Sequence, residues 1–188
     1  MLQVFRFIQA RGLKIENPAK AIRPSAITTF KARDRALSPS EIHIFFNALE
    51  QTATMSTLRL AIKFMLLTLV RKSEFIEAIW DEVNFETAIW TIPKERMKAG
   101  RPHNVYLSQQ ALDILVALKT CFGASSYLHP GRYETTLPIS AATLNRVIDV
   151  TVKLIRDRGE DFEPFTVHDL RRTAQHSVAR GWLRQRLD

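Results

Sequence analysis

Cysteine and long apolar segments are scarce in this sequence of 188 residues, and each scarcity excludes a class of protein. The single cysteine, Cys121, excludes an internal disulfide framework and a cysteine-rich zinc site. The most apolar stretch, residues 58–70, is interrupted near its start by Arg59 and Lys63, so we expect no membrane-spanning segment. The N-terminal residues lack the basic start and apolar centre of a secretory signal. These features predict a cytoplasmic protein.

Positive charge, in contrast, is abundant and unevenly distributed. The formal net charge is +8, and residues 1–36 contain eight basic and two acidic residues, against nineteen and seventeen in the rest. A basic segment beside a nearly neutral body is typical of contact with a polyanion, most often nucleic acid. A solvated tail that only aids solubility would have the same composition.

The order of helix-breaking and periodic segments predicts three regions. Residues 3–11 have the pattern of a helix end and are followed by a break in the chain. The basic residues 23–36 lack periodicity, which is typical of a linker. The prediction is therefore the end of one domain, a linker and a main domain, over residues 1–22, 23–36 and 37–188.

The main domain is predicted to be α+β, mainly α-helical, with a small three-stranded antiparallel sheet. Ser38, Pro39 and Glu41 have the spacing of a helix N-cap with a capping box. Short segments rich in Ile, Val and Trp predict a hairpin and a third strand. After the helix that begins at Ser38, the predicted helices are 57–70, 74–79, 108–119, 141–158 and 167–180, and the predicted strands are 78–83, 88–92 and 103–107.

The run His168-Asp169-Leu170-Arg171-Arg172 opens the last predicted helix. His168 and Arg171 are three residues apart, so their side chains share one face of the helix. An imidazole and a guanidinium in a first helical turn, together with free backbone N–H groups, suit a phosphate group. The alternative is a solvated helix start with the histidine packed on the core.

Arg71 directly follows the most apolar segment, so we expect it at the end of a buried helix. An arginine there can simply complement the helix dipole. It would also be held rigidly, as a clamp for transition-state charge must be. Glu74 is placed to pair with it, and Lys72 is expected on the solvent side.

The loop between the second and third predicted strands carries four basic residues and one acid. It is either an ordinary charged hairpin tip or a mobile finger that reaches a phosphate backbone. A lysine in such a finger could protonate a leaving alkoxide. The basic residues are Lys94, Arg96, Lys98 and Arg101.

These three sites occur in an order that resembles a known family. An apolar helix that ends in Arg-x-x-Glu is followed by a hairpin lysine, by Arg-Pro-His-x-Val-x-Leu-Ser and by Thr-x-His-Asp-Leu-Arg-Arg-Thr-Ala. The chain resembles the catalytic domain of a tyrosine recombinase, specifically a prophage-type integrase, over about residues 36–182. Residues 12–19 resemble the end of that family's core-binding domain. The resemblance implies the tyrosine recombinase catalytic-domain fold, shortened at both ends.

The resemblance also implies residue roles in the breakage and rejoining of DNA. Arg71, His168 and Arg171 would bind the scissile phosphate. Lys98 would act as general acid toward the 5′ hydroxyl leaving group, with Lys94 as the second choice. Arg172 lies within one turn of His168 and is the alternative to Arg171, but the family register favours Arg171. The expected DNA contacts are Lys94, Arg96, Arg101 and Arg172.

The tyrosine nucleophile that the family uses has no counterpart here. Tyr106, Tyr127 and Tyr133 all precede His168. His176 comes too early in the sequence to match the family's second histidine. Trp182 is not expected to replace that histidine as a phosphate ligand. Without a nucleophile no covalent phosphotyrosyl intermediate can form, so the chain alone is predicted to be inactive.

The implied partner is double-stranded DNA, with no membrane, cofactor or metal ion. The family works as a tetramer, and this chain is expected to be a monomer or a weak dimer, associated with DNA in a bacterial cytoplasm. Two alternatives stay open. One is a non-catalytic DNA-binding or regulatory remnant of an integrase gene, and the other is a generic helical regulator.

Overall fold

The computed structural model describes residues 7, 10–12, 35–97 and 100–179, with side chains as far as Thr173. The chain divides into two compact units, Met1–Asp34 and Arg35–Asp188. In the first unit, Phe7 and Ala10 are helical, and the Arg11 guanidinium lies 4.3 Å from the centre of the Phe7 ring. The rest of the predicted N-terminal helix and nearly all of the predicted linker lie outside the described residues. All elements named below belong to the second unit.

Helix α3 (Pro39–Glu50) begins with the predicted capping box. The Ser38 hydroxyl accepts from the Glu41 backbone N–H at 3.2 Å, and the Glu41 carboxylate accepts from the Ser38 N–H at 2.8 Å. Glu41 also pairs with Arg35, which reaches Glu163 as well. The start of the unit is therefore fixed to α3 and to the loop that precedes the last helix.

Helix α4 (Ser56–Thr68) is the centre of the unit and packs against α6, α7 and α8. Its apolar side chains, such as Phe64 and Met65, are buried, as its sequence predicts. The helix ends earlier than predicted. Leu69 takes a left-handed conformation, with φ +58°, and turns the chain away from the helix axis. Arg71 is therefore not the end of α4 but the residue that precedes α5 (Lys72–Ile76).

The sheet contains β1 (Val83–Asn84), β2 (Ile89–Ile92) and β3 (His103–Tyr106) in antiparallel order β1-β2-β3. Trp90 is opposite Val83 on one side and Val105 on the other, and all three are buried. The prediction of a first strand over residues 78–83 is largely wrong. Trp80–Glu82 form a 3₁₀ helix, and the Trp80 N–H donates to the carbonyl of Ser126.

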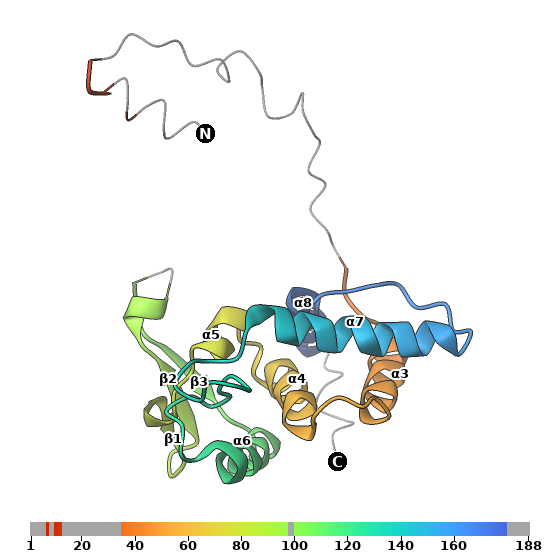
Figure 1. The fold of residues 1–188 in the computed structure, drawn as a ribbon, viewed down its shortest axis with the longest axis horizontal. Coiled ribbons are helices and arrows are strands. Elements are labelled where there is room, and N and C mark those ends of the chain that lie inside the picture. Colours follow the sequence, from red (N-terminus) through yellow and green to blue (C-terminus); the bar gives the residue numbers. More distant parts are fainter. Residues whose placement is uncertain (1–6, 8–9, 13–34, 98–99, 180–188) are drawn as a thin grey trace. The chain divides into compact units, whose positions relative to one another are not determined.

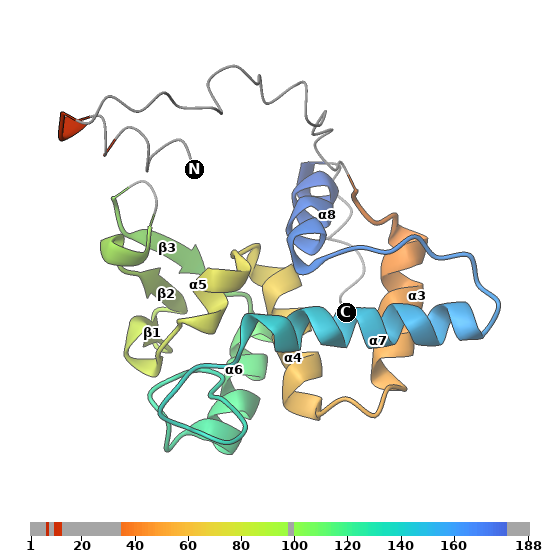
Figure 2. The ribbon, with the colours of Figure 1, turned by 45° about the horizontal axis from the view of Figure 1, so that its top comes forward.

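Three longer helices complete the unit: α6 (Gln109–Phe122), α7 (Ala141–Asp157) and α8 (Val167–Ala179). The Ser108 hydroxyl caps α6 by accepting from Ala111, as predicted. In both ribbon views the sheet, α5 and α6 lie at one end and α3 at the other, with α7 running between them (Figure 1, Figure 2). The start of α7 therefore comes beside α5, far from it in sequence.

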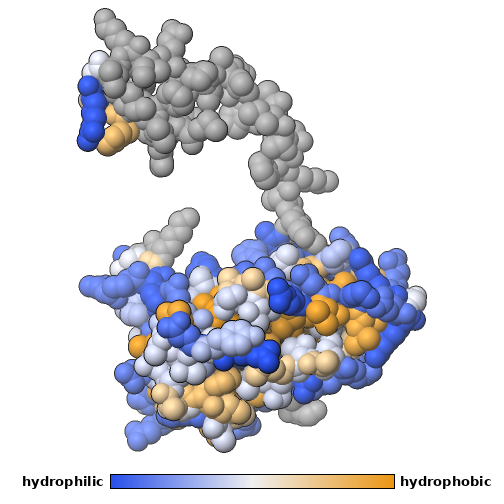
Figure 3. All heavy atoms as spheres, in the orientation of Figure 1, coloured by the Kyte–Doolittle hydropathy of each residue, from blue (hydrophilic) through white to orange (hydrophobic). Residues whose placement is uncertain are grey.

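The core runs through the whole unit. Its largest fully buried side chains include Trp90, Phe45, Phe64, Phe75 and Phe162. Charged and polar residues cover much of the visible face, with apolar residues emerging between them (Figure 3). In the described ranges, no helix combines the length and the apolar character needed to cross a bilayer.

Candidate phosphate site

Glu74 is the buried centre of the site. Its carboxylate accepts from the Arg71 backbone N–H at 2.6 Å and from the Arg71 guanidinium at 2.5 Å. The Glu74 side chain is 5% exposed, whereas that of Arg71 is 50% exposed. The chain turn at Leu69 and the first turn of α5 produce this arrangement. A buried carboxylate thus holds both ends of an arginine whose charged group reaches the surface.

Arg171 approaches the same carboxylate from α8. Its Nη1 atom lies 3.8 Å from the second oxygen of Glu74, and its side chain is 23% exposed. Burial lowers the pKa of Arg171, and the nearby positive charge of Arg71 lowers it further, while Glu74 acts in the opposite direction. Two guanidinium groups therefore share one carboxylate, which leaves an excess of positive charge at this point.

His168 lies one turn before Arg171, with an exposed ring. Thr166 and Asp169 fix the start of its helix, because the Asp169 carboxylate accepts from the Thr166 N–H and hydroxyl, both at 2.8 Å. Leu37 donates its N–H to the Thr173 hydroxyl, which in turn donates to the Asp169 carbonyl. This capping arrangement was not predicted, although the Thr-x-x-Asp spacing indicates it.

Arg71, His168 and Arg171 line one hollow of about 420 Å³. Arg171 lines it and Arg172 does not, so the structure separates the two candidates. None of the three tyrosines of the sequence lines it. The lining residues come from the α4–α5 turn, the start of α7 and the start of α8: Val70, Arg71, Lys72, Ser73, Asn145, Thr166, Val167, His168 and Arg171.

Two further polar residues of the hollow, Lys72 and Asn145, were not predicted as site residues. The Lys72 ammonium donates to the Asn145 side-chain oxygen at 3.2 Å, which joins α5 to α7. Lys72 is half-buried and its bond to Asn145 is exposed to solvent, which agrees with the predicted solvent side. Seventy-three positions separate the two residues, so no local sequence pattern could have paired them.

Arg96 has a different environment from the one predicted for a DNA contact. Its side chain is 15% exposed, its guanidinium forms an ion pair with Glu82, and it donates to the Glu74 backbone carbonyl at 3.2 Å. Glu82 also accepts from the Trp90 indole at 3.0 Å. These contacts favour a structural role, in which Arg96 ties the hairpin to α5.

The remaining hairpin residues were predicted to contact DNA or to act as the general acid. Lys94 and Arg101 are exposed. Lys98 lies outside the described residues, so its role as general acid stays a prediction. Among the described residues, no group of three or more His, Cys, Asp or Glu side chains is placed to hold a metal ion.

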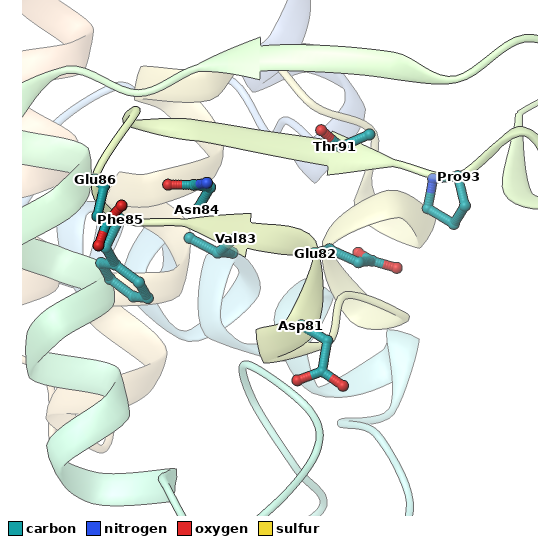
Figure 4. A pocket seen from close by; sticks show the side chains of 8 residues that line it. All are labelled: Asp81, Glu82, Val83, Asn84, Phe85, Glu86, Thr91 and Pro93. Carbon is teal, nitrogen blue, oxygen red and sulfur yellow. The ribbon is translucent and has the colours of Figure 1, made fainter.

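A second hollow, of about 600 Å³, lies beside the sheet (Figure 4). Its lining includes the carboxylates of Asp81, Glu82 and Glu86. Like charges repel, so this acidic hollow is unsuited to a phosphate. Of these two hollows, the one lined by Arg71 and Arg171 has the charge that suits an anion.

The sequence model of the phage integrase family matches residues 35–183, which is most of the chain. The chain belongs to the phage integrase family. Prophage integrase IntZ of Escherichia coli (strain K12) is 31% identical over 147 residues, which cover 78% of this chain and 36% of that protein. This chain spans about a third of the length of the curated relatives that it matches.

Solved structures show the same fold. The Tn1549 transposon integrase in complex with a circular intermediate DNA has a TM-score of 0.72 and 14% identity, over 95% of this chain and 63% of that one. A lambda integrase tetramer bound to a Holliday junction has a TM-score of 0.67 and 22% identity, over 95% of this chain and 49% of that one. The predicted fold class, a tyrosine recombinase catalytic domain with a small antiparallel sheet, is confirmed. The interpretation as a generic helical regulator is wrong, because the family match covers the domain.

Proposed function

We propose that this integrase-family chain is the catalytic domain of a site-specific recombinase. Its hollow would receive the scissile phosphate of double-stranded DNA. The observation that carries the proposal is the pair of guanidinium groups, Arg71 and Arg171, that share the buried carboxylate of Glu74. A phosphodiester placed between them would remove their mutual repulsion and supply the missing negative charge. The structural relatives that contain DNA support the choice of ligand.

Three residues of the hollow and one lysine of the hairpin have proposed tasks in strand cleavage. Arg71 and Arg171 neutralise the charge that builds on the phosphoryl oxygens, from positions that the protein fixes before DNA binds. His168 donates a hydrogen bond to the same phosphate from the first turn of α8. Lys98 protonates the departing 5′ hydroxyl oxygen. Because no tyrosine lines the hollow, we propose that this chain alone forms no covalent intermediate with DNA.

The alternative is a non-catalytic DNA-binding protein with the integrase fold, in which the same two arginines would hold DNA without cleaving it. A nicked duplex tests the proposed inactivity, because it traps the covalent adduct of a cleaving recombinase. Incubation of this chain with such a duplex is expected to give no adduct on a denaturing gel. An adduct would show that the chain cleaves DNA by itself, which would contradict both the alternative and the proposed inactivity.

Replacing Arg171 tests the phosphate site directly. Arg171→Ala is expected to weaken binding to a short duplex roughly tenfold or more, because a charge-assisted contact is lost. The salt dependence of binding, as the slope of log K against log salt concentration, is expected to fall by about 0.9 for one lost phosphate contact. Titration at several salt concentrations measures both quantities.

Arg158→Ala is the matched control, since it removes the same charge from an exposed arginine that bonds to Gln51. It is expected to leave the slope nearly unchanged. Circular dichroism should show that Arg171→Ala keeps the fold. A large loss of stability with an unchanged slope would mean that Arg171 is structural, and the proposed site would fail.

The assembly of the protein is also part of the proposal. The lambda integrase relative forms a tetramer on a Holliday junction. We propose that the full-length parent of this chain assembles in the same way on DNA and acts in the bacterial cytoplasm. This chain by itself is proposed to be a monomer or a weak dimer, which sedimentation analysis would measure.

A further inference from the structure

The hollow carries more positive charge than one phosphodiester can neutralise. Arg71 and Arg171 together with Glu74 leave one net positive charge, which matches the single negative charge of one phosphate. Lys72 adds another positive charge to the same lining. In the described part of the chain, no carboxylate lies within ion-pair distance of the Lys72 ammonium. One cation is therefore in excess.

The donors of Lys72 and Asn145 are only partly used. The Lys72 ammonium has three N–H donors, and one of them is directed to the Asn145 oxygen at 3.2 Å. That bond orients the Asn145 amide, whose two N–H donors have no partner among the described residues. An ammonium and an amide side by side form a pair of donors that suits the oxygens of an anion.

The position of this pair fits a continuous DNA strand. Lys72 directly follows Arg71, and Asn145 lies at the start of α7, which comes beside α5 (Figure 1, Figure 2). A DNA strand presents one phosphate per about 3.4 Å of helix axis, so a strand with one phosphate at the arginines brings the next one close by. The flexible stem of a lysine can span such a short distance.

We infer that Lys72 and Asn145 form a second phosphate subsite, which binds the backbone phosphate adjacent to the scissile one. The inference rests on the proposed function, because the arginine site defines which phosphate is adjacent. Lys72 supplies the charge, and Asn145 holds the ammonium and donates its amide hydrogens. The subsite would fix the strand on two successive phosphates and so set the scissile phosphate between the arginines.

The salt dependence of duplex binding tests the inference, because its slope counts phosphate contacts. Lys72→Ala is expected to lower the slope by about 0.9. Asn145→Asp is expected to lower it by a similar amount, because the new carboxylate would neutralise Lys72. The matched control is Lys153→Ala, which removes an exposed lysine of α7 that is paired with Asp157. It should leave the slope unchanged.

The double variant Lys72→Ala/Arg171→Ala shows whether the two residues bind different phosphates. Two phosphates predict that the two single falls add to about 1.8, and one shared phosphate predicts a fall clearly smaller than that sum. The second result would overturn the inference, and so would a Lys72→Ala slope equal to that of the Lys153→Ala control. In both cases a reduced slope for Arg171→Ala leaves the proposed function standing. An unchanged slope for Arg171→Ala would instead remove the proposed function.

Discussion

Glu74 shows how one buried side chain can organise a surface site. A carboxylate with 5% exposure would be costly without partners, and here two arginines and a backbone N–H surround it. The Glu74 charge also stabilises the two arginines, because it offsets the repulsion between their guanidinium groups. The geometry of the site thus depends on a residue that the proposed substrate does not touch.

Replacing Glu74 with glutamine is expected to lower the free energy of unfolding by roughly 1–3 kcal/mol, because the buried charge partner of two arginines is lost. Urea denaturation measures the change. Glu77→Gln is the control, since Glu77 ends the same short helix and is exposed. It is expected to change stability by less than about 0.5 kcal/mol. Equal effects of the two variants would show that Glu74 has no special structural role.

The helices and turns differ in how far they could be predicted. The caps at Ser38 and Ser108 were predicted correctly, because a cap depends on residues within one turn of each other. The end of α4 was not predicted correctly. The left-handed residue there is Leu69, whereas glycine is the usual signal for that conformation. At the 3₁₀ helix, the Trp80 N–H donates to the carbonyl of Ser126, a partner that is distant in sequence.

The same distinction applies to the candidate site. Arg71, His168 and Arg171 were identified from motifs, and the structure brings them to one hollow. The contact of Lys72 with Asn145 spans 73 positions, and that of Arg96 with Glu82 joins the two sides of the hairpin, 14 positions apart. Nothing in the local sequence specifies such pairs, so only the folded arrangement shows them.

The turn before β2 contains a residue in an unfavourable conformation. Ala88 has φ +54°, in the left-handed region where a side chain costs roughly 1 kcal/mol and glycine does not. Ala88→Gly is therefore expected to raise the free energy of unfolding by about 0.5–1 kcal/mol. The same substitution at Ala117, inside α6, is expected to lower it by about 1 kcal/mol. Thermal denaturation of both variants checks the opposite signs, and a loss of stability in Ala88→Gly would contradict the argument.

Arg35 links distant parts of the second unit, because it forms ion pairs with Glu41 of α3 and with Glu163 of the loop before α8. The Arg35 hydrogen bond lowers the pKa of Glu41 to about 2, from an ordinary value of 4.5. A carboxyl group whose pKa is lower in the folded state stabilises the fold above the ordinary pKa. That stability is lost as the pH falls from about 4.5 toward about 2.

Comparison of the natural chain with Glu41→Gln at several pH values measures this contribution. Above pH 4.5 the variant is expected to be less stable by roughly 1–3 kcal/mol, and the difference should shrink as the pH approaches 2. Glu86→Gln, at an exposed position in the hairpin turn, serves as the control and should show little difference at any pH. A difference that stays constant with pH would refute the assigned cause.

The sharing of Glu74 between Arg71 and Arg171 also affects when the site can form during synthesis of the chain. A ribosome adds about 5–20 residues per second, and Arg171 is added nearly a hundred residues after Glu74. For about 5–20 s of synthesis the growing chain therefore contains only half of the phosphate hollow. An unfinished copy would lack the proposed contact of Arg171 with a phosphate, and the hollow would form only when α8 is made.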